Sequence, residues 1–160
     1  MMNRGLDGSP RVFHGQAADV TRASLEESFV LVSAVDHYPE WCPDIVREVE
    51  VFDRGTDGHP SRVRMRMRVA RGAIVREFDL YLVVAVEPPR TVDLTRTTDH
   101  PTNQEFNATW MLSSAGSTTI ALELDAKLRV PHFIPAGGIP DEIAQGFVSS
   151  ACRALGTQSE

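Results

Sequence analysis

Histidines are the side chains in this sequence most suited to metal binding or proton transfer. They lie at positions 14, 37, 59, 100 and 132, and none belongs to an HxxxH or HExxH pattern. The sequence also lacks a GxSxG pattern, a phosphate-binding loop of the P-loop type and a GxGxxG pattern. We therefore expect no metal site, no bound cofactor and no activated serine.

Three ionisable residues fall on, or close to, the inward-facing parity of strands that the sequence predicts. These are His14, Arg76 and Glu105. An ionisable group that faces a core is costly unless it is paired, so such positions are candidates for a catalytic group or a polar anchor. They are weak candidates, and the catalytic residues stay unknown. Cys42 has no neighbouring histidine or cationic helix end, so we do not expect a reactive thiolate there.

Arginine recurs at every second position of one predicted strand, at 62, 64, 66 and 68. Alternation of this kind places all four side chains on one face of the strand. Acidic residues on the adjoining strands can pair with them across that face, namely Glu48, Glu50, Glu77 and Asp79. Because the formal net charge is also −6, we interpret the stripe as a solvated face and expect no nucleic-acid partner.

An amphipathic helix is predicted over residues 139–155, close to the end of the chain. Ile143, Phe147, Ala151 and Leu155 recur every four residues and form a wide apolar stripe. Gly156 is placed to terminate the helix, and a second glycine at position 146 interrupts it. Such a helix is not stable alone in water, so it must pack against another element.

A first helix is predicted over residues 24–35, where the sequence SLEE forms a capping box between Ser24 and Glu27. Two prolines between residues 36 and 43 prevent regular continuation and favour a single short helical turn. We expect Asp36 to cap that turn, and Tyr38 and Trp41 to pack it against the body of the protein.

Period-two alternation dominates the rest of the chain. It predicts strands over residues 11–20, from 46 onward, and over 62–71, 74–86, 91–97, 105–112 and 118–130. Each strand is polar on one side only, which is typical of a single antiparallel sheet with one solvated face. The sequence therefore predicts an α+β fold, in which a curved sheet of about seven strands covers the terminal helix and two short helices follow the first strand.

Length and composition indicate one domain, because 160 residues with 42% hydrophobic content can form a genuine core. We expect a disordered leader over residues 1–10 and a single domain over 11–157. No run of some eighteen apolar residues is present, so no integral membrane segment is expected. Cys42 and Cys152 stand far apart without a CxxC pattern, which favours free thiols and a cytoplasmic location.

The pattern D-x-x-Y-P-x-W, formed by Asp36, Tyr38, Pro39 and Trp41, follows the apolar first helix and precedes a Val/Glu strand. Together with an E-P-P sequence at 87–89 and a P-x-F-I-P loop at 131–135, this order resembles the START-like polyketide cyclase/dehydrase and coenzyme-Q-binding family. The resemblance covers nearly the whole chain from about residue 11. It implies a helix-grip fold with an apolar cavity for a lipid, isoprenoid, polyketide-like or other hydrophobic ligand.

The apolar face that would line such a cavity is shared by the central strands and the terminal helix. Its members are Met65, Met67, Phe78, Leu80, Leu82, Phe106, Trp110, Leu122, Leu124, Phe147 and Ala151. The same residues could simply fill a core, and the resemblance is what favours a pocket. Tyr38, Trp41, Phe133 and Ile134 are the candidates for the cavity mouth.

Three functions remain open at this stage. The protein could be a non-catalytic carrier of a small hydrophobic molecule. It could instead be a cyclase/dehydrase-type enzyme that uses polar groups in the cavity, although the inner face is mostly aliphatic and such chemistry needs several convergent polar groups. A third reading is a protein-interaction module or homodimer that uses a sheet edge or the loop at residues 133 and 134.

Overall fold

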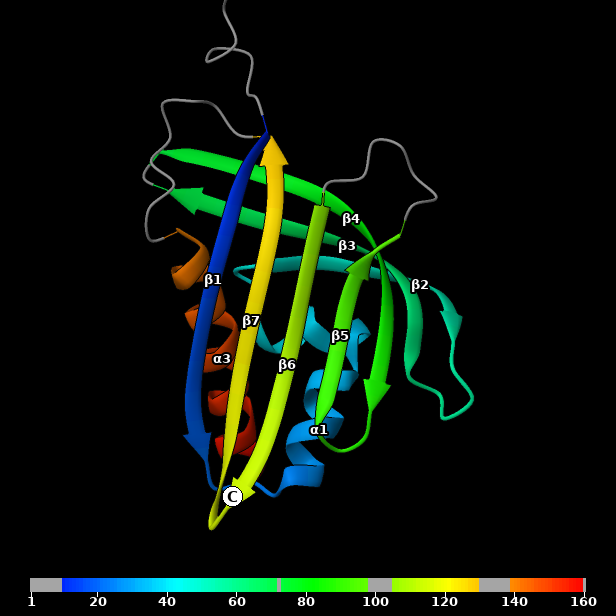
Figure 1. Ribbon diagram of the computed structural model, residues 1–160, viewed down its shortest axis with the longest axis vertical. Helices are drawn as coiled ribbons and strands as arrows, with labels where there is room; N and C mark the ends of the chain where they lie inside the picture. The colour runs from blue at the N-terminus through cyan, green and yellow to red at the C-terminus, as the bar shows by residue number, and fades with distance from the viewer. Residues whose placement is uncertain (1–9, 72, 98–104, 130–138, 160) are drawn as a thin grey trace, which may run out of the picture.

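A computed structural model of the chain describes residues 10–71, 73–97, 105–129 and 139–159. A single curved sheet partly encloses the helices (Figure 1). Its strands are β1 (Pro10–Thr21), β2 (Val46–Arg54), β3 (Pro60–Arg71), β4 (Ile74–Glu87), β5 (Thr91–Arg96), β6 (Glu105–Ala115) and β7 (Ser117–Arg129). The helical elements are α1 (Leu25–Ser33), the 3-10 turn η1 (Val35–His37), α2 (Tyr38–Trp41) and α3 (Ile139–Ser159).

The seven strands are antiparallel and lie in the order β1-β7-β6-β5-β4-β3-β2. The last helix, α3, packs mainly on β1 and also on β7, while α1 packs on β5 and β6 (Figure 1). The sheet, the two short helices after the first strand and the long C-terminal helix confirm the predicted α+β, helix-grip architecture. The expected leader at residues 1–10 lies almost wholly outside the described residues.

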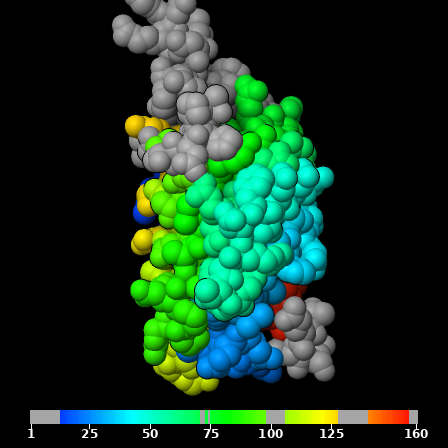
Figure 2. All heavy atoms as spheres, turned by 90° about the vertical axis from the view of Figure 1, so that its right-hand side faces the viewer, coloured from blue at the N-terminus to red at the C-terminus, as the bar shows by residue number. Residues whose placement is uncertain are grey.

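Alternation in β3 is as regular in the structure as it is in the sequence. Met65 and Met67 are each 1% exposed, whereas Arg64 and Arg66, which alternate with them, lie on the opposite face. Glycines make two of the tight turns, because Gly58 and Gly116 both adopt positive φ, which other residues rarely tolerate. Figure 2 shows the side of the molecule on which the β2–β3 hairpin lies next to α1.

The capping box at the start of α1 is confirmed. The Glu27 backbone N–H donates to the Ser24 hydroxyl at 3.0 Å, and the Ser24 N–H donates to the Glu27 carboxylate at 2.9 Å. The predicted cap by Asp36 is wrong, since neither η1 nor α2 has a side-chain cap. The Asp36 carboxylate instead accepts a hydrogen bond from Arg54 of β2 at 3.0 Å, where it gains an ion pair.

The predicted end of α3 at Gly156 is wrong, because the helix continues to Ser159. A glycine ends a helix by adopting positive φ, and only Gly58 and Gly116 do so within the described ranges. The interruption expected at Gly146 is also absent. Its missing side chain makes room for Ile45, whose Cδ1 would lie 2.8 Å from an added Cβ.

Gly15 of β1 brings the start of α3 directly onto the sheet. A Cβ at this position would lie 2.3 Å from the carbonyl carbon of Pro140. The Asp141 carboxylate accepts a hydrogen bond from the Gln16 backbone N–H at 3.1 Å, and the Asp19 carboxylate accepts one from the Val20 N–H at 2.8 Å. Because β1 is an edge strand, these two carboxylates cover amides that face no neighbouring strand.

No helix in the described part of the chain is long and apolar enough to cross a membrane.

Candidate functional site

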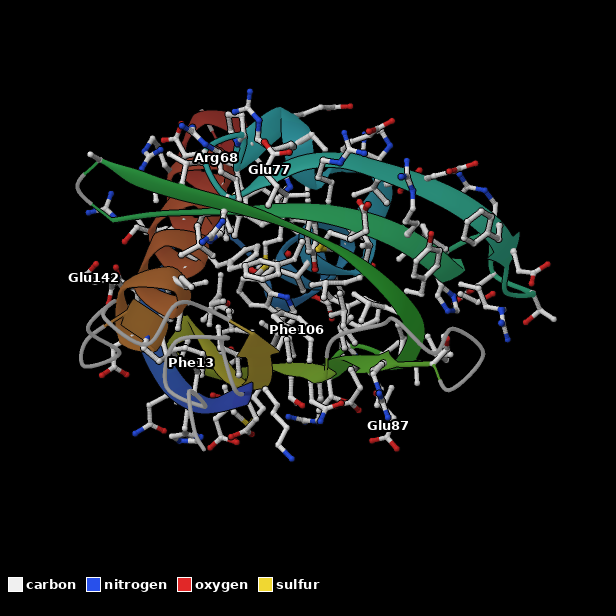
Figure 3. The ribbon with its side chains drawn as sticks, turned by 90° about the horizontal axis from the view of Figure 1, so that it is seen from above. Phe13, Arg68, Glu77, Glu87, Phe106 and Glu142 are labelled. Carbon is white, nitrogen blue, oxygen red and sulfur yellow. The ribbon has the colours of Figure 1, made fainter. Side chains whose placement is uncertain are left out.

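The inner face of the sheet and α3 brings together all eleven apolar side chains expected to line a cavity. Each of them is at most 8% exposed. Figure 3 shows Phe106 pointing into the space between the sheet and α3, while Arg68 and Glu77 point away from it on the far side of β3 and β4. Their inward orientation is therefore as predicted, and their role as a ligand cavity stays a prediction.

The size of the inward-facing side chains varies strongly along this face. Phe13 and Phe106 both pair with Ala126 in the register of β1, β7 and β6, so a small residue separates two large rings. In an adjacent row the order of sizes is reversed, because Gly15 and Ala108 flank Leu124. The absence of a side chain at Gly15 allows the start of α3 to approach the sheet.

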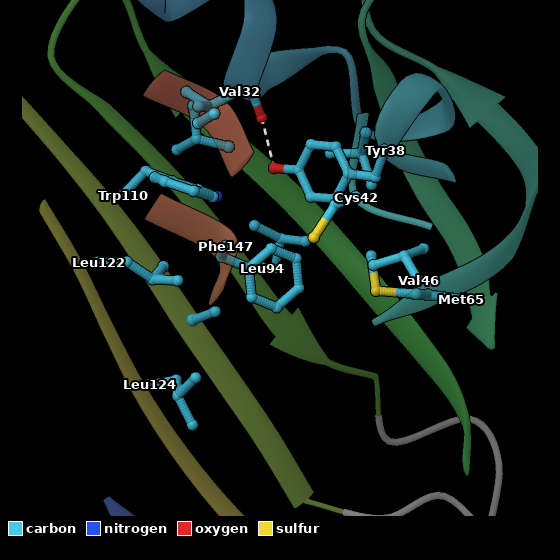
Figure 4. Close-up of a cluster of buried hydrophobic side chains, with 14 of the residues drawn as sticks. Val32, Tyr38, Cys42, Val46, Met65, Leu94, Trp110, Leu122, Leu124 and Phe147 are labelled. Carbon is cyan, nitrogen blue, oxygen red and sulfur yellow. Dashed lines mark hydrogen bonds between the residues drawn. The ribbon is translucent and has the colours of Figure 1, made fainter. Parts of the chain in front are cut away.

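Four aromatic residues from α2, β6 and α3 form one cluster, and Figure 4 shows three of them, Tyr38, Trp110 and Phe147, in the interior. Tyr38 lies edge to face with Trp41, Trp110 and Phe147, with ring centroids 5.0, 6.5 and 6.1 Å apart. Trp110 makes further edge contacts with Trp41 at 6.4 Å and Phe147 at 6.1 Å. Such geometry is favourable for aromatic pairs and joins three elements that are distant in sequence. We call these residues the aromatic cluster.

The Tyr38 hydroxyl has a structural role. It donates to the Val32 carbonyl oxygen at 2.5 Å (Figure 4), and burial raises its pKa, with a side-chain hydrogen bond from Trp110 opposing the rise. The residue is 1% exposed. The position at a cavity mouth predicted for Tyr38 is therefore wrong, because its hydroxyl is anchored to α1 inside the core, but its predicted packing role is confirmed.

Trp41 is partly exposed, in keeping with a position near the surface. Its indole nitrogen, however, is buried and has no hydrogen-bond partner. An indole N–H can only donate, so this group is unsatisfied. The other two mouth candidates, Phe133 and Ile134, lie outside the described residues.

The Cys42 thiol is buried beside the aromatic cluster. Burial raises its pKa to about 11, and a hydrogen bond with the Ser150 side chain opposes the shift. Since only the thiolate is an effective nucleophile, the thiol is unreactive near neutral pH, as expected from the sequence. Both Cys42 and Cys152 are free.

His14 does not face the interior, so its predicted inward orientation is wrong. Phe13 and Gly15 occupy the inward positions of β1, and His14 lies on the outer face with a half-exposed side chain. Its Nδ1 lies 2.6 Å from the Asp125 carboxylate. That hydrogen bond and the charge of Asp125 raise the pKa of His14 above 6.5.

Of the other two weak catalytic candidates, the structure describes the side chain of Arg76. Arg76 shares the parity of Phe78 on β4, but it is exposed near the end of the strand. Glu105 is the first residue of β6, and its side chain lies outside what the structure describes, so the prediction for it is not tested.

Buried polar side chains in the described part of the chain are all hydroxyl-bearing, and none is charged. They are Thr21, Ser28, Ser33, Thr97 and Thr118, besides the Tyr38 phenol. No group of three His, Cys, Asp or Glu residues among those described could hold a metal ion. The described interior is thus suited to an apolar molecule and offers no buried acid or base.

The arginine stripe is engaged by carboxylates, as the sequence predicted. Arg64 lies within 3.7 Å of Glu48, Glu50 and Asp79, and Arg66 contacts Glu48 and Asp79. These pairs form a network across β2, β3 and β4 on the outer face of the sheet.

A groove that the sequence did not reveal lies on the outer face of β1, β7 and β6. Its volume is about 270 Å³, and it is lined by Gln16, Ala17, Ala18, Met111, Ala121, Leu122 and Glu123. The small alanines of two neighbouring strands leave this hollow between larger side chains. Such a groove has no periodic signature in sequence, because it depends on which strands are paired.

Comparison with known proteins gives one family and a set of solved structures. The family model described as polyketide cyclase / dehydrase and lipid transport matches residues 21–149, well over half of the chain. No curated protein matches the sequence.

Among solved structures, a START superfamily protein from Mycobacterium smegmatis is similar, with a TM-score of 0.72 and 19% identity, over 91% of this chain and 98% of that one. An aromatase/cyclase from a Streptomyces species has a TM-score of 0.61 and 14% identity, over 94% and 97% of the two chains. A major latex-like protein from Panax ginseng has a TM-score of 0.63 and 11% identity, over 92% and 97%. At these identities the likeness shows a common fold.

Proposed function

Since the chain belongs to the polyketide cyclase / dehydrase and lipid transport family, we propose that it binds or carries a small hydrophobic molecule between the curved sheet and α3. The ligand is a lipid, an isoprenoid or a polyketide-like molecule. The observation that carries this proposal is the inner face, whose eleven buried side chains are all apolar. Burial of a ligand there would contribute about 25 cal/mol for each Å² of apolar surface removed from water.

The proposed cavity lining combines rigid rings with adaptable side chains. Trp110 and Phe147 of the aromatic cluster supply large contact areas, while Met65 and Met67 can adjust to ligands of different shape. Trp41, the partly exposed member of the cluster, is the described residue that best suits the proposed mouth. Such a lining suits ligands of different shapes.

The test uses a neutral apolar fluorophore, N-phenyl-1-naphthylamine, and a pair of matched variants. Ala126→Leu adds three carbons to the inner face of β7, and Ala121→Leu adds the same atoms to its outer face. We expect the first to weaken probe binding about tenfold, equivalent to about 1.4 kcal/mol, and the second to leave it unchanged. Circular dichroism and thermal melting establish that both variants are folded.

Two results would contradict the proposal. One is a wild-type protein that binds no apolar probe and shows no added mass in native mass spectrometry after gentle purification. The other is an equal loss of probe binding in both leucine variants, since a specific inner site predicts a difference between them.

A cyclase/dehydrase-type enzyme is the alternative within the same family. Ring closure of a polyketide-like chain needs convergent acid and base groups. The inner-face groups closest to that chemistry are the Tyr38 hydroxyl, which is bonded to Val32, and the Cys42 thiol with its raised pKa. Turnover of a poly-β-ketone substrate that is lost when Cys42 is replaced by alanine and Tyr38 by phenylalanine, with both variants still folded, would favour the enzyme.

The remaining proposals concern partners and location. The carboxylates that engage Arg64 and Arg66 support the absence of a nucleic-acid partner. The free thiols of Cys42 and Cys152 support a reducing, cytoplasmic location. A homodimer, the form that an interaction module would take, is tested by light scattering across a hundredfold range of protein concentration.

A further inference from the structure

We propose that the ligand carries a carbonyl oxygen and that the indole N–H of Trp41 donates a hydrogen bond to it. This inference rests on the proposed binding function and adds a chemical class to it. It begins from one unsatisfied donor in the aromatic cluster.

The orientation of the Trp41 ring is unusual. A tryptophan at a boundary commonly buries its hydrocarbon part and leaves the N–H in contact with water. Here the residue is partly exposed, yet the nitrogen itself is solvent-inaccessible and has no partner. The exposed atoms therefore belong to another part of the ring, and the N–H is covered by protein atoms. Burying a donor in this way is unfavourable unless an acceptor meets it.

Among the described residues, no group accepts a hydrogen bond from this N–H. Its ring lies against Tyr38 and Trp110, which are side chains of the buried inner face. The Tyr38 hydroxyl donates to the Val32 carbonyl and accepts a hydrogen bond from the Trp110 side chain. Aromatic ring faces are only weak acceptors of N–H groups.

Within the described ranges, two buried side-chain nitrogens lack a hydrogen-bond partner, Nε1 of Trp41 and Nε of Arg64. Arg64 belongs to the outer face, where its guanidinium nitrogens lie close to three carboxylates. The Trp41 N–H is thus the unsatisfied donor that belongs to the interior. Because it can only donate, its ligand partner must be an acceptor, and a carbonyl oxygen is the acceptor that an otherwise apolar molecule can carry at small desolvation cost.

The arrangement discriminates between apolar ligands of equal size. A molecule with a carbonyl satisfies the donor, whereas a pure hydrocarbon leaves it unpaired. A site built around a buried polar group rejects analogues that lack the matching group more strongly than it rejects analogues that differ by one methylene. We expect the carbonyl to lie at the aromatic cluster and the rest of the ligand to contact the aliphatic inner face.

The experiment compares two neutral probes, 2-acetylnaphthalene and 2-isopropylnaphthalene, which differ mainly in the carbonyl oxygen. Affinities are divided by each probe's transfer constant from water to hexadecane. In Trp41→Phe, which keeps a ring but removes the N–H, we expect the ketone-to-hydrocarbon affinity ratio to fall about tenfold, the scale of one hydrogen bond. In the control Met111→Leu, which changes a side chain of the outer-face groove, the ratio should not change.

The outcomes separate the two proposals. If neither probe binds the wild-type protein, the binding function itself fails. If both bind but their ratio is the same in Trp41→Phe, the binding function stands and the carbonyl inference is overturned. A second readout uses the wild-type protein labelled with nitrogen-15, so it does not depend on the variant folding. The Trp41 indole proton should shift downfield with the ketone and not with the hydrocarbon, and equal shifts would also overturn the inference.

Discussion

Replacing Gly15 by alanine should detach the beginning of α3 from the sheet. The added Cβ would lie 2.3 Å from both the carbonyl carbon and the oxygen of Pro140, and 2.7 Å from the Asp141 nitrogen. All three are backbone atoms, so no side-chain rotation relieves the overlap. Favourable contacts between heavy atoms begin near 3.5 Å, so the first turn of α3 must move away by about 1 Å.

The free energy of unfolding should fall by about 2–3 kcal/mol. Overpacking of a rigid interface costs about 1–3 kcal/mol, and this contact is at the severe end. Movement of the helix also weakens the hydrogen bond from the Gln16 N–H to Asp141, which contributes about 1 kcal/mol. Replacing a strand glycine recovers about 0.5–1 kcal/mol through the entropy of the unfolded chain.

Urea unfolding followed by circular dichroism measures this change. With a slope of about 1–3 kcal/mol per molar urea, the midpoint should move down by about 1–2 M. The matched control is Gly156→Ala, also a glycine of the α3 region, where an added Cβ meets nothing within 4 Å. It should be neutral or stabilising by up to about 1 kcal/mol, since alanine favours a helix. A Gly15→Ala protein within about 0.5 kcal/mol of wild type would refute the close approach of α3.

Three further outcomes are expected. Tyr38→Phe loses the buried hydrogen bond to α1, so its unfolding free energy by urea titration should drop by about 1–2 kcal/mol. The pKa of the Cys42 thiol is about 11 against an ordinary 9.0, so at pH 8 Cys42 should react with iodoacetamide about 100-fold more slowly in the folded than in the unfolded protein. Peptide mapping measures the two rates, and similar rates would contradict the burial of the thiol. Because Asp125 raises the pKa of His14 above 6.5, the stability that this pair contributes is fully present below pH 6.5 and is lost as the pH rises through the raised pKa. An NMR titration should show the pKa of His14 falling in Asp125→Asn, and an unchanged pKa would exclude the pair.

Where many apolar side chains alternate with charged ones, the sequence predicted the structure well. In β3 the methionines at 65 and 67 alternate with arginines, so both the strand and its inward face follow from period two alone. The capping box at Ser24 was equally predictable, because both of its hydrogen bonds join residues that are close in sequence.

The predicted orientation of a strand was wrong where its inward-facing residues are small. Gly15 and Ala17 occupy the inner parity of β1 because α3 lies so close, and their small size made His14 look like the inward residue. The partner of Asp36 is eighteen positions away on β2, and a local capping rule has no information about Arg54. The orphan N–H of Trp41 depends on three elements meeting, which no spacing encodes.

The carboxylates of Asp19 and Asp141 occupy the outward amides of β1 at Val20 and Gln16. These two amides are therefore not available to a strand from another copy, which disfavours extension of the sheet at the β1 edge. Replacing Asp19 and Asp141 by alanine should therefore expose these amides and favour edge-to-edge pairing of two copies through β1.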